Sequence, residues 1–193
     1  MQNTNAIDDE LAAYVAQGRV LLARGDCQAA LEQFDRALAL CEQRLGPAHP
    51  HTATMLHNLG TVLYALRRYK DAQPYLERAL AQRELALGPQ HPDTAESYNN
   101  LAALHYARRD YGAALPLFER ALRIREQAIG MWHPDTASTL NNIGTALHAQ
   151  GRYPEARRAL ARALTIFEAA LGPAHPRTVA CCDDLAIVQA KLQ

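Results

Sequence analysis

A tetrapeptide, His-Pro-x-Thr, recurs four times along the sequence at a constant spacing of 42 residues. Its copies begin at His49, His91, His133 and His175. A long constant period is typical of a chain that stacks one supersecondary unit on itself, so that each unit contacts mainly its neighbours. Function in such chains usually resides in a surface that several units build together. Any catalytic interpretation has to be weighed against that architecture.

The unit between residues 91 and 130 shows the expected local structure. His91 precedes a proline and is disfavoured in the α region, whereas Pro92 suits the first position of a helix. Apolar side chains then recur at helical spacing to about residue 108, which predicts a first helix, called helix A here. A second helical pattern, helix B, runs from about Tyr111 to Ile129, and Gly130 stands where a left-handed αL residue would end it. Strand patterns are absent throughout, which predicts an all-α fold.

Small residues recur at fixed places when the units are aligned. One place in helix A is occupied by Gly18, Gly60, Ala102, Gly144 and Ala186, and one place in helix B by Ala30, Ala72, Ala114 and Ala156. We therefore expect the two helices of a unit to approach closely, with larger side chains such as Phe34 and Leu76 between them. The predicted organisation is a single array over residues 1–193, with units at 6–46, 47–88, 89–130 and 131–172 and a closing helix at 173–193.

Composition and charge argue against several classes of partner. The chain has 20 basic and 20 acidic residues, so no global field attracts nucleic acid or an anionic membrane. No apolar stretch approaches the roughly 18 residues of a membrane helix, and the N-terminal residues lack the pattern of a signal peptide. We expect a cytoplasmic protein with no nucleic-acid or membrane partner.

The four cysteines form neither a CxxC motif nor a secreted disulfide pattern. Cys27 and Cys182 align with tyrosine or leucine in other units, which predicts buried thiols at both positions. Cys181 and Cys182 are adjacent, but neighbouring residues of a helix point about 100° apart, which disfavours a redox pair.

Neither a metal site nor a catalytic site is predicted. The four motif histidines occur once per unit and should lie roughly 10 Å apart, too far for the bonds of about 2 Å that zinc requires. We therefore expect them to act at helix starts. Nucleophile elbows, phosphate-binding glycine loops and HExxH motifs are absent from the sequence. The chain is predicted to be no enzyme and to need no cofactor.

These repeats resemble those of a known family. Leu59-Gly60 in helix A, with Tyr69, Ala72 and Leu76 in helix B, resembles the tetratricopeptide repeat. The longer unit, with Leu-Gly-Pro-x-His-Pro-x-Thr-Ala, Asn-Asn and Arg-Tyr-x-x-Ala, is similar to the kinesin light chain type over about residues 6–192. The resemblance implies a right-handed superhelical α-solenoid of helix-turn-helix hairpins, whose concave wall is lined by the A helices and binds peptide segments. The chain lacks the heptad coiled coil of kinesin light chains, so we expect no motor role.

The resemblance also places particular side chains on the concave wall. The predicted partner-binding residues are Arg19, Asn58, Asn99, Asn100, Asn141, Asn142, Tyr64, Tyr106 and His148. Asparagine is a poor helix former, so its repeated use in the middle of helix A requires a reason. Its amide can pair with the backbone of an extended peptide, or it can bridge adjacent A helices, and one residue can do both. Basic residues are scarce on this wall, which argues against a carboxylate clamp and for a neutral or mildly basic peptide.

Three groups of residues have two interpretations each. Tyr64, Tyr106 and His148 either face the partner or pack inside the array. His105 occupies a core-facing position, where a packed, hydrogen-bonded histidine is favoured over a ligand. Met131-Trp132 replaces the Pro-Ala or Pro-Gln of the sister turns, and we expect these two side chains to pack over helix ends rather than form an exposed contact spot.

The sequence as a whole predicts a protein-interaction scaffold that binds a peptide segment of a partner protein in the groove of the A helices. The alternative is a structural module that self-associates through the terminal helix. The chain is expected to be a monomer or a weak homodimer through that helix. Leu185, Ile187 and Val188 of that helix are either shielded by the preceding hairpin or paired with another copy.

Overall fold

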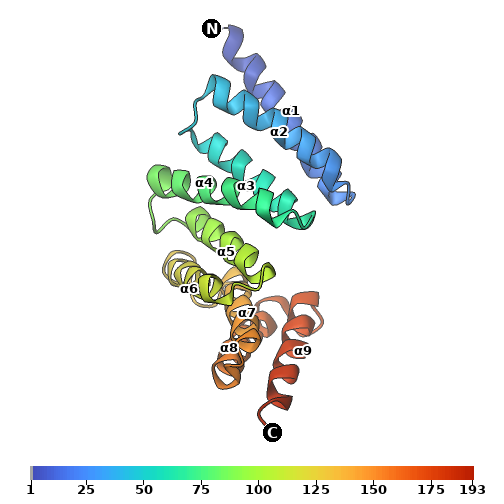
Figure 1. Ribbon diagram of the computed structural model, residues 1–193, viewed down its shortest axis with the longest axis vertical. Coiled ribbons are helices and arrows are strands. Elements are labelled where there is room, and N and C mark those ends of the chain that lie inside the picture. Colours follow the sequence, from blue (N-terminus) through green and yellow to red (C-terminus); the bar gives the residue numbers. More distant parts are fainter. Residues whose placement is uncertain (1) are drawn as a thin grey trace. The chain divides into compact units, whose positions relative to one another are not determined.

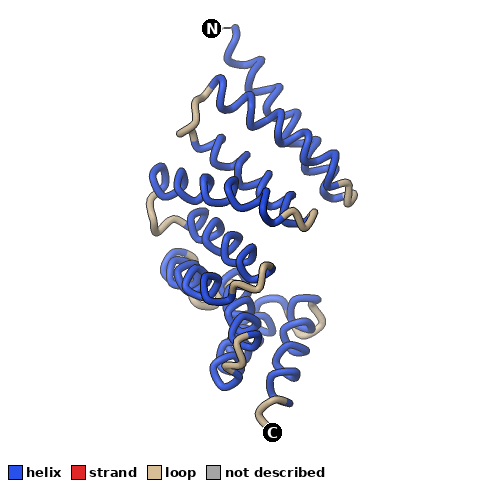
Figure 2. The backbone as a smooth tube through the Cα atoms, viewed as in Figure 1, coloured by secondary structure: helices blue, strands red, loops and turns tan. Residues whose placement is uncertain are grey.

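The chain folds into helices joined by short turns, and Figures 1 and 2 show no strand in the part of the chain that the structure describes. The structure is a computed structural model, which describes the backbone of residues 2–193 and the side chains from residue 9 onward. Two compact units divide the chain, unit 1 up to Pro89 and unit 2 from Gln90 to Gln193. The predicted all-α fold class is confirmed.

Unit 1 consists of two helical hairpins. Its first helix packs on the second, the second also packs on the third, and the third packs on the fourth. The helices are α1 (Gln2–Ala23), α2 (Cys27–Arg44), α3 (Pro50–Ala65) and α4 (Tyr69–Leu87). In these hairpins α1 and α3 are A helices, whereas α2 and α4 are B helices.

Unit 2 repeats this arrangement and ends on one additional helix. Each helix packs on the next in sequence, and the A helices α5 and α7, and likewise α7 and α9, also touch. The helices are α5 (Pro92–Ala107), α6 (Tyr111–Ala128), α7 (Pro134–Ala149), α8 (Tyr153–Leu171) and α9 (Pro176–Ala190). The predicted hairpins and the final helix A are confirmed, whereas the repeat boundaries and the superhelical handedness stay predictions.

Each His-Pro step begins a helix A in the same way. His91 adopts an extended backbone, with φ −77° and ψ 142°, and its Nδ1 accepts a hydrogen bond from the amide of Asp93 at 3.1 Å. His49, His133 and His175 cap α3, α7 and α9 with the same bond, at 3.2, 3.1 and 3.1 Å. The proline then occupies the first turn, where its missing N–H leaves no helical bond unmade. The predicted action of these histidines at helix starts is confirmed.

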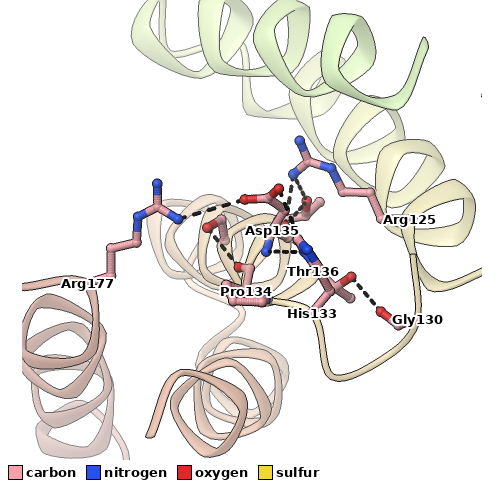
Figure 3. A network of polar contacts seen from close by, with 9 residues as sticks. Arg125, Gly130, His133, Pro134, Asp135, Thr136 and Arg177 are labelled. Carbon is pink, nitrogen blue, oxygen red and sulfur yellow. Dashed lines mark hydrogen bonds and ion pairs between the residues drawn. The ribbon is translucent and has the colours of Figure 1, made fainter. Parts of the chain in front are cut away.

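The threonine of the motif has a role that the sequence did not reveal. Thr136 of α7 is buried, and its hydroxyl donates a hydrogen bond to the carbonyl of Gly130 at 2.9 Å (Figure 3). Thr52 and Thr178 make the same bond, at 2.8 Å, to the glycines of their own turns. The histidine of the motif therefore caps helix A, and the threonine stabilises the preceding turn through a hydrogen bond to the glycine carbonyl.

The glycine after helix B has a positive φ, as predicted, but its ψ differs from the predicted αL conformation. Gly88 has φ 91° and ψ 160°, and Gly172 has φ 86° and ψ 160°. This combination is accessible almost only to glycine. Each of the two precedes a proline, which excludes helical ψ values from the residue before it. The chain therefore leaves helix B in an extended direction.

The small residues let the two helices of a hairpin approach closely, as predicted. A Cβ added to Gly60 would lie 2.6 Å from the side chain of Leu76, and one added to Gly144 would lie 2.5 Å from Leu160. Phe34 and Phe118 fill the same layer in their hairpins and are almost completely buried. Because this layer recurs in each hairpin, it fixes the register of every A helix against its B helix.

The cysteines correct one prediction. Cys181 is buried against α8, where desolvation raises the pKa of its thiol to about 12, whereas the neighbouring Cys182 is exposed. The expected burial of Cys182 is therefore wrong, although the equivalent Leu140 of α7 is buried. The reason is that α8 packs against α7 and covers that face, whereas no described helix follows α9 to cover the same face there. Cys27 is half-buried.

Candidate partner-binding surfaces

The A helices of unit 1 enclose a groove of about 690 Å³ between α1 and α3. Its apolar lining consists of Leu11, Ala12, Val15, Ala16 and Met55, and its polar lining of Arg19, His51 and Thr54. A concave, largely apolar surface with a few polar groups is the usual form of a binding site. Among the predicted partner-binding residues of unit 1, Arg19 lines this groove, whereas Asn58 and Tyr64 lie outside its lining.

The equivalent surface of unit 2 is polar. Counting 84 residues forward, Val15 corresponds to Asn99, Ala16 to Asn100 and Met55 to Thr139. We call the surface built by the A helices of a unit its A-wall. At these positions unit 1 has apolar side chains, whereas unit 2 has two half-buried amides and the buried hydroxyl of Thr139.

Two asparagines of unit 2 bridge neighbouring A helices. The Nδ2 of Asn142 donates to the Oδ1 of Asn99 at 3.1 Å, which joins α7 to α5. The Nδ2 of Asn141 donates to the Oδ2 of Asp184 at 3.4 Å, which joins α7 to α9. Bridging, one of the two roles considered for these residues, therefore occurs within unit 2. The Oδ1 of Asn141 is buried and accepts no hydrogen bond from the described residues.

An arginine of helix B reaches the A-wall of unit 2 and was not anticipated from the sequence. The Nη1 of Arg125 in α6 donates to the carbonyl of Asp135 at 2.9 Å and to the Oγ1 of Thr139 at 2.7 Å. The carboxylate of Asp135 lies 3.8 Å from Arg177 of α9, so the network links α6, α7 and α9 (Figure 3). Desolvation lowers the pKa of Arg125, and the charges of Asp135 and Glu96 partly oppose that shift.

A related arginine is present in unit 1. Arg83 of α4 occupies the position equivalent to Arg125, and its Nη1 lies 3.4 Å from the Nδ1 of His57 in α3. Arg83 is 6% exposed and His57 is 7% exposed, so this contact is inside the unit. The other two 42-residue repeats have Cys41 and Phe167 at this position. An arginine among apolar equivalents is the sequence signal that indicates such an insertion.

The predicted aromatic residues pack within their own hairpins. Tyr64 lies against Tyr69, with ring centroids 5.5 Å apart, and Tyr106 lies against Tyr111 at 5.4 Å. His148 packs on the first residue of α8 in the same tilted geometry at 5.6 Å. Each ring is half-buried, so one part of it packs at the end of helix A while another part stays accessible.

The prediction for His105 agrees with the structure, whereas the prediction for the Met131-Trp132 pair does not. The Nδ1 of His105 is 3.1 Å from the Oδ2 of Asp110, in agreement with the predicted packed, hydrogen-bonded histidine. A hydrogen bond from the amide of Ala113 and the bond with His105 hold the pKa of Asp110 below its ordinary value. Met131 and Trp132 are 56% and 63% exposed, so the expectation that they pack over helix ends is wrong. They form an exposed spot that, together with Arg162, Thr165 and Ile166 of α8, lines a cleft of about 190 Å³.

Metal-ligating side chains do not converge in the described part of the chain. No group of three or more His, Cys, Asp or Glu residues has the arrangement of a metal site among these residues. Among the same residues, every helix is too short or too polar to cross a membrane.

The repeated hairpins, the close glycine contacts and the A-walls define an α-solenoid of helix-turn-helix repeats. Two models of the tetratricopeptide repeat match the sequence, one at residues 9–84 and 52–127 and one at residues 136–177. The chain therefore belongs to the tetratricopeptide repeat family, whose fold is that of a protein-interaction scaffold and whose members are typically non-enzymatic. A search of curated protein sequences returns no match.

Several solved structures resemble the fold of this chain. BtubC (BKLC) from P. vanneervenii is 29% identical with a TM-score of 0.76, and the match covers 86% of this chain and 66% of BtubC. This chain thus spans just under two thirds of that protein. A putative kinesin light chain of Podosopora anserina is 24% identical with a TM-score of 0.80, over 94% and 86% of the two chains. The apo form of RapI is 21% identical with a TM-score of 0.75, over 95% and 49%. The last two show the fold alone.

Proposed function

We propose that the chain binds a peptide segment of a partner protein on its A-walls and acts by binding rather than by catalysis. The observation that carries this proposal is the groove of about 690 Å³ between α1 and α3. Its apolar side chains offer an anchor site for one or two apolar residues of the partner, and Arg19 and Thr54 offer polar contacts beside them. Such pockets with a few polar groups at the rim commonly dominate binding energy.

The A-wall of unit 2 would supply polar contacts rather than an anchor. Asn99 still has two amide hydrogens to donate, and Asn142 still has an Oδ1 to accept, after their mutual hydrogen bond is counted. Asn58, Asn100, Asn141, Tyr64, Tyr106 and His148 complete the set of proposed contacts. Amides of this kind pair with the backbone of an extended peptide whatever its sequence. The expected ligand is a neutral or mildly basic segment with an apolar anchor.

A peptide array followed by titration tests this proposal. Peptides that bind the wild-type chain on the array are titrated in solution against Ala16→Arg, which places a long charged side chain in the groove. Ala81→Arg, at an exposed position of α4, is the matched control. Affinity should fall at least about tenfold in Ala16→Arg and stay unchanged in Ala81→Arg. Array selection of acidic C-termini, or equal affinity of both variants, would contradict the proposal.

A second candidate function is self-association through α9. Leu185 and Val188 are covered by α8, but Val179 and Ile187 are 48% and 52% exposed on the same helix. Two copies pairing through this face would remove those side chains from water. Light scattering over a concentration series distinguishes this from the first proposal. A mass that rises with concentration and returns to that of a monomer in Ile187→Asp supports self-association, and a monomer at every concentration rejects it.

A further inference from the structure

A second groove of about 440 Å³ lies between the B helices α2 and α4 of unit 1. Its floor is apolar, with Leu59 and Leu63 of α3 at the bottom and Leu31, Pro74 and Tyr75 at the sides. No residue lines both this groove and the one between α1 and α3. Helix α3 contributes to both, but through different residues: His51, Thr54 and Met55 line the first groove, and Leu59 and Leu63 line the second. The groove between α2 and α4 is therefore a separate surface, which the proposed function does not use.

The polar side chains at this groove are predominantly acidic. Glu32 and Asp35 of α2 are exposed at its rim and form no ion pair within the described part of the chain. Asp71 of α4 also lines the groove, but Arg68 lies 2.8 Å from its carboxylate and neutralises it. Two uncompensated carboxylates thus share one rim, where they repel each other. A cation placed over the groove would relieve this repulsion.

The equivalent positions of unit 2 show that this charge is specific to unit 1. The pair formed by Arg68 and Asp71 recurs there as Arg152 and Glu155, with a shortest N···O distance of 2.6 Å. Glu32, however, is replaced by Pro116, and Pro74 is replaced by Arg158. The carboxylate at the position of Asp35, Glu119, therefore has a positive charge among its neighbours in the repeat. Unit 1 carries an excess of two negative charges at these positions, whereas unit 2 carries none.

We propose that the groove between α2 and α4 is a docking site for a segment of a partner protein in which apolar side chains are flanked by lysine or arginine. The apolar side chains would lie over Leu59, Leu63 and Tyr75, and the flanking cations would pair with Glu32 and Asp35. Charge complementarity selects this occupant, because an acidic or purely apolar segment would leave both carboxylates uncompensated or desolvated. The site would let the chain hold two different segments at once.

A short fluorescein-labelled peptide, Lys-Leu-Lys-Lys-Leu-Lys, tests the site by fluorescence polarisation. Two variants alter the groove: Glu32→Gln with Asp35→Asn removes both rim charges, and Pro74→Arg introduces the charge found in unit 2. Each should weaken binding about tenfold or more, because two exposed ion pairs are lost or opposed. The matched control, Glu77→Gln with Glu119→Gln, removes the same number of charges outside the groove and should leave affinity unchanged. Replacing both leucines of the peptide by serine should abolish binding.

Three results would overturn this proposal. Equal weakening by the control variant would show that the peptide responds to net charge alone. Binding of the serine peptide as tightly as the leucine peptide would exclude the apolar floor. Light scattering without peptide provides the third: a dimer that dissociates in Glu32→Gln with Asp35→Asn would assign the groove to a second copy of this chain. Circular dichroism on every variant confirms that the helices are retained. Failure here leaves the groove between α1 and α3 untouched, since Ala16→Arg reports on that surface separately.

Discussion

The A-walls of the two units have the same framework and opposite chemistry. In unit 1, Val15, Ala16 and Met55 line an open groove between α1 and α3. In unit 2, the equivalent Asn99, Asn100 and Thr139 belong to a wall whose helices are joined by side-chain hydrogen bonds. The large side chains of the buried layer between helix A and helix B are the same in both units: Phe34 and Leu76 in unit 1, and Phe118 and Leu160 in unit 2. The repeat architecture therefore sets the position of each A-wall. A few side chains determine whether the wall has an open groove or helices joined by hydrogen bonds.

The largest expected effect concerns the shared framework. Phe34→Ala and Phe118→Ala each remove a buried ring from the layer between helix A and helix B, one in each unit. Both should lower the free energy of unfolding by about 3–5 kcal/mol, measured by urea denaturation. Leu85→Ala, at a position 88% exposed, is the control and should change little. A clear difference between the two phenylalanine variants would show that the units do not share one framework.

The next effect tests whether Arg125 of helix B stabilises the A-wall of unit 2. Arg125→Met removes the hydrogen bonds to Asp135 and Thr139 and should destabilise the protein by about 1.5–3 kcal/mol, since bonds to charged groups are the stronger ones. Arg19→Met alters an exposed arginine of the A-wall of unit 1 and should change stability by less than about 0.5 kcal/mol. Thermal unfolding of both variants measures the contrast. Equal losses of stability in the two variants would mean that an arginine also stabilises the A-wall of unit 1.

A smaller effect isolates the asparagine bridge. Asn142→Ala removes the bond to Asn99 and should cost about 1 kcal/mol in the free energy of unfolding. Asn58, the equivalent residue of unit 1, has no side-chain hydrogen bond to another described residue, and Asn58→Ala should be close to neutral. Denaturation of the two single variants gives the comparison. A loss in Asn58→Ala as large as that in Asn142→Ala would remove the distinction between the walls.

The smallest effect is a pH dependence at the turn between α5 and α6. Hydrogen bonds from Ala113 and His105 hold the pKa of Asp110 below its ordinary value of 3.8. The stability that these bonds contribute is therefore present above that value and is lost as the pH falls through the lower pKa of the folded state. Carbon-13 NMR titration of the carboxyl should place its midpoint below 3.8 in the wild type and closer to 3.8 in His105→Leu. An unchanged midpoint in that variant would exclude the histidine as a cause.

The sequence was sufficient to predict the helices, because their signals are local. A proline at the first helical position, a glycine at the end of helix B and a helical apolar period each act within a few residues. The family resemblance and the close contacts of Gly60 and Gly144 follow from the same constant spacing. Thr136 escaped this reasoning, because its bond to Gly130 depends on how the turn folds back.

The candidate surfaces were less accessible from sequence, because they depend on long-range packing. Asn142 meets Asn99 only when two A helices lie side by side, and the sequence could not show whether an amide would face a helix or a partner. The burial of Arg125 and the exposure of Trp132 likewise depend on what lies across from each side chain. The groove between α1 and α3 has no motif of its own, since it consists of ordinary apolar residues that leave a space between them.

Exchanging side chains between the two A-walls tests the central claim most directly. Val15→Asn with Ala16→Asn gives the A-wall of unit 1 the residues of unit 2 and keeps Phe34 and Leu76 of the buried layer, although Val15 packs against its edge. The measurement is the affinity of an array-selected peptide for this variant, determined by isothermal titration calorimetry beside the wild type. We predict a loss of at least about tenfold in affinity, with the helical fold retained in circular dichroism. Unchanged affinity would contradict the claim that the open groove of unit 1 is the anchor site.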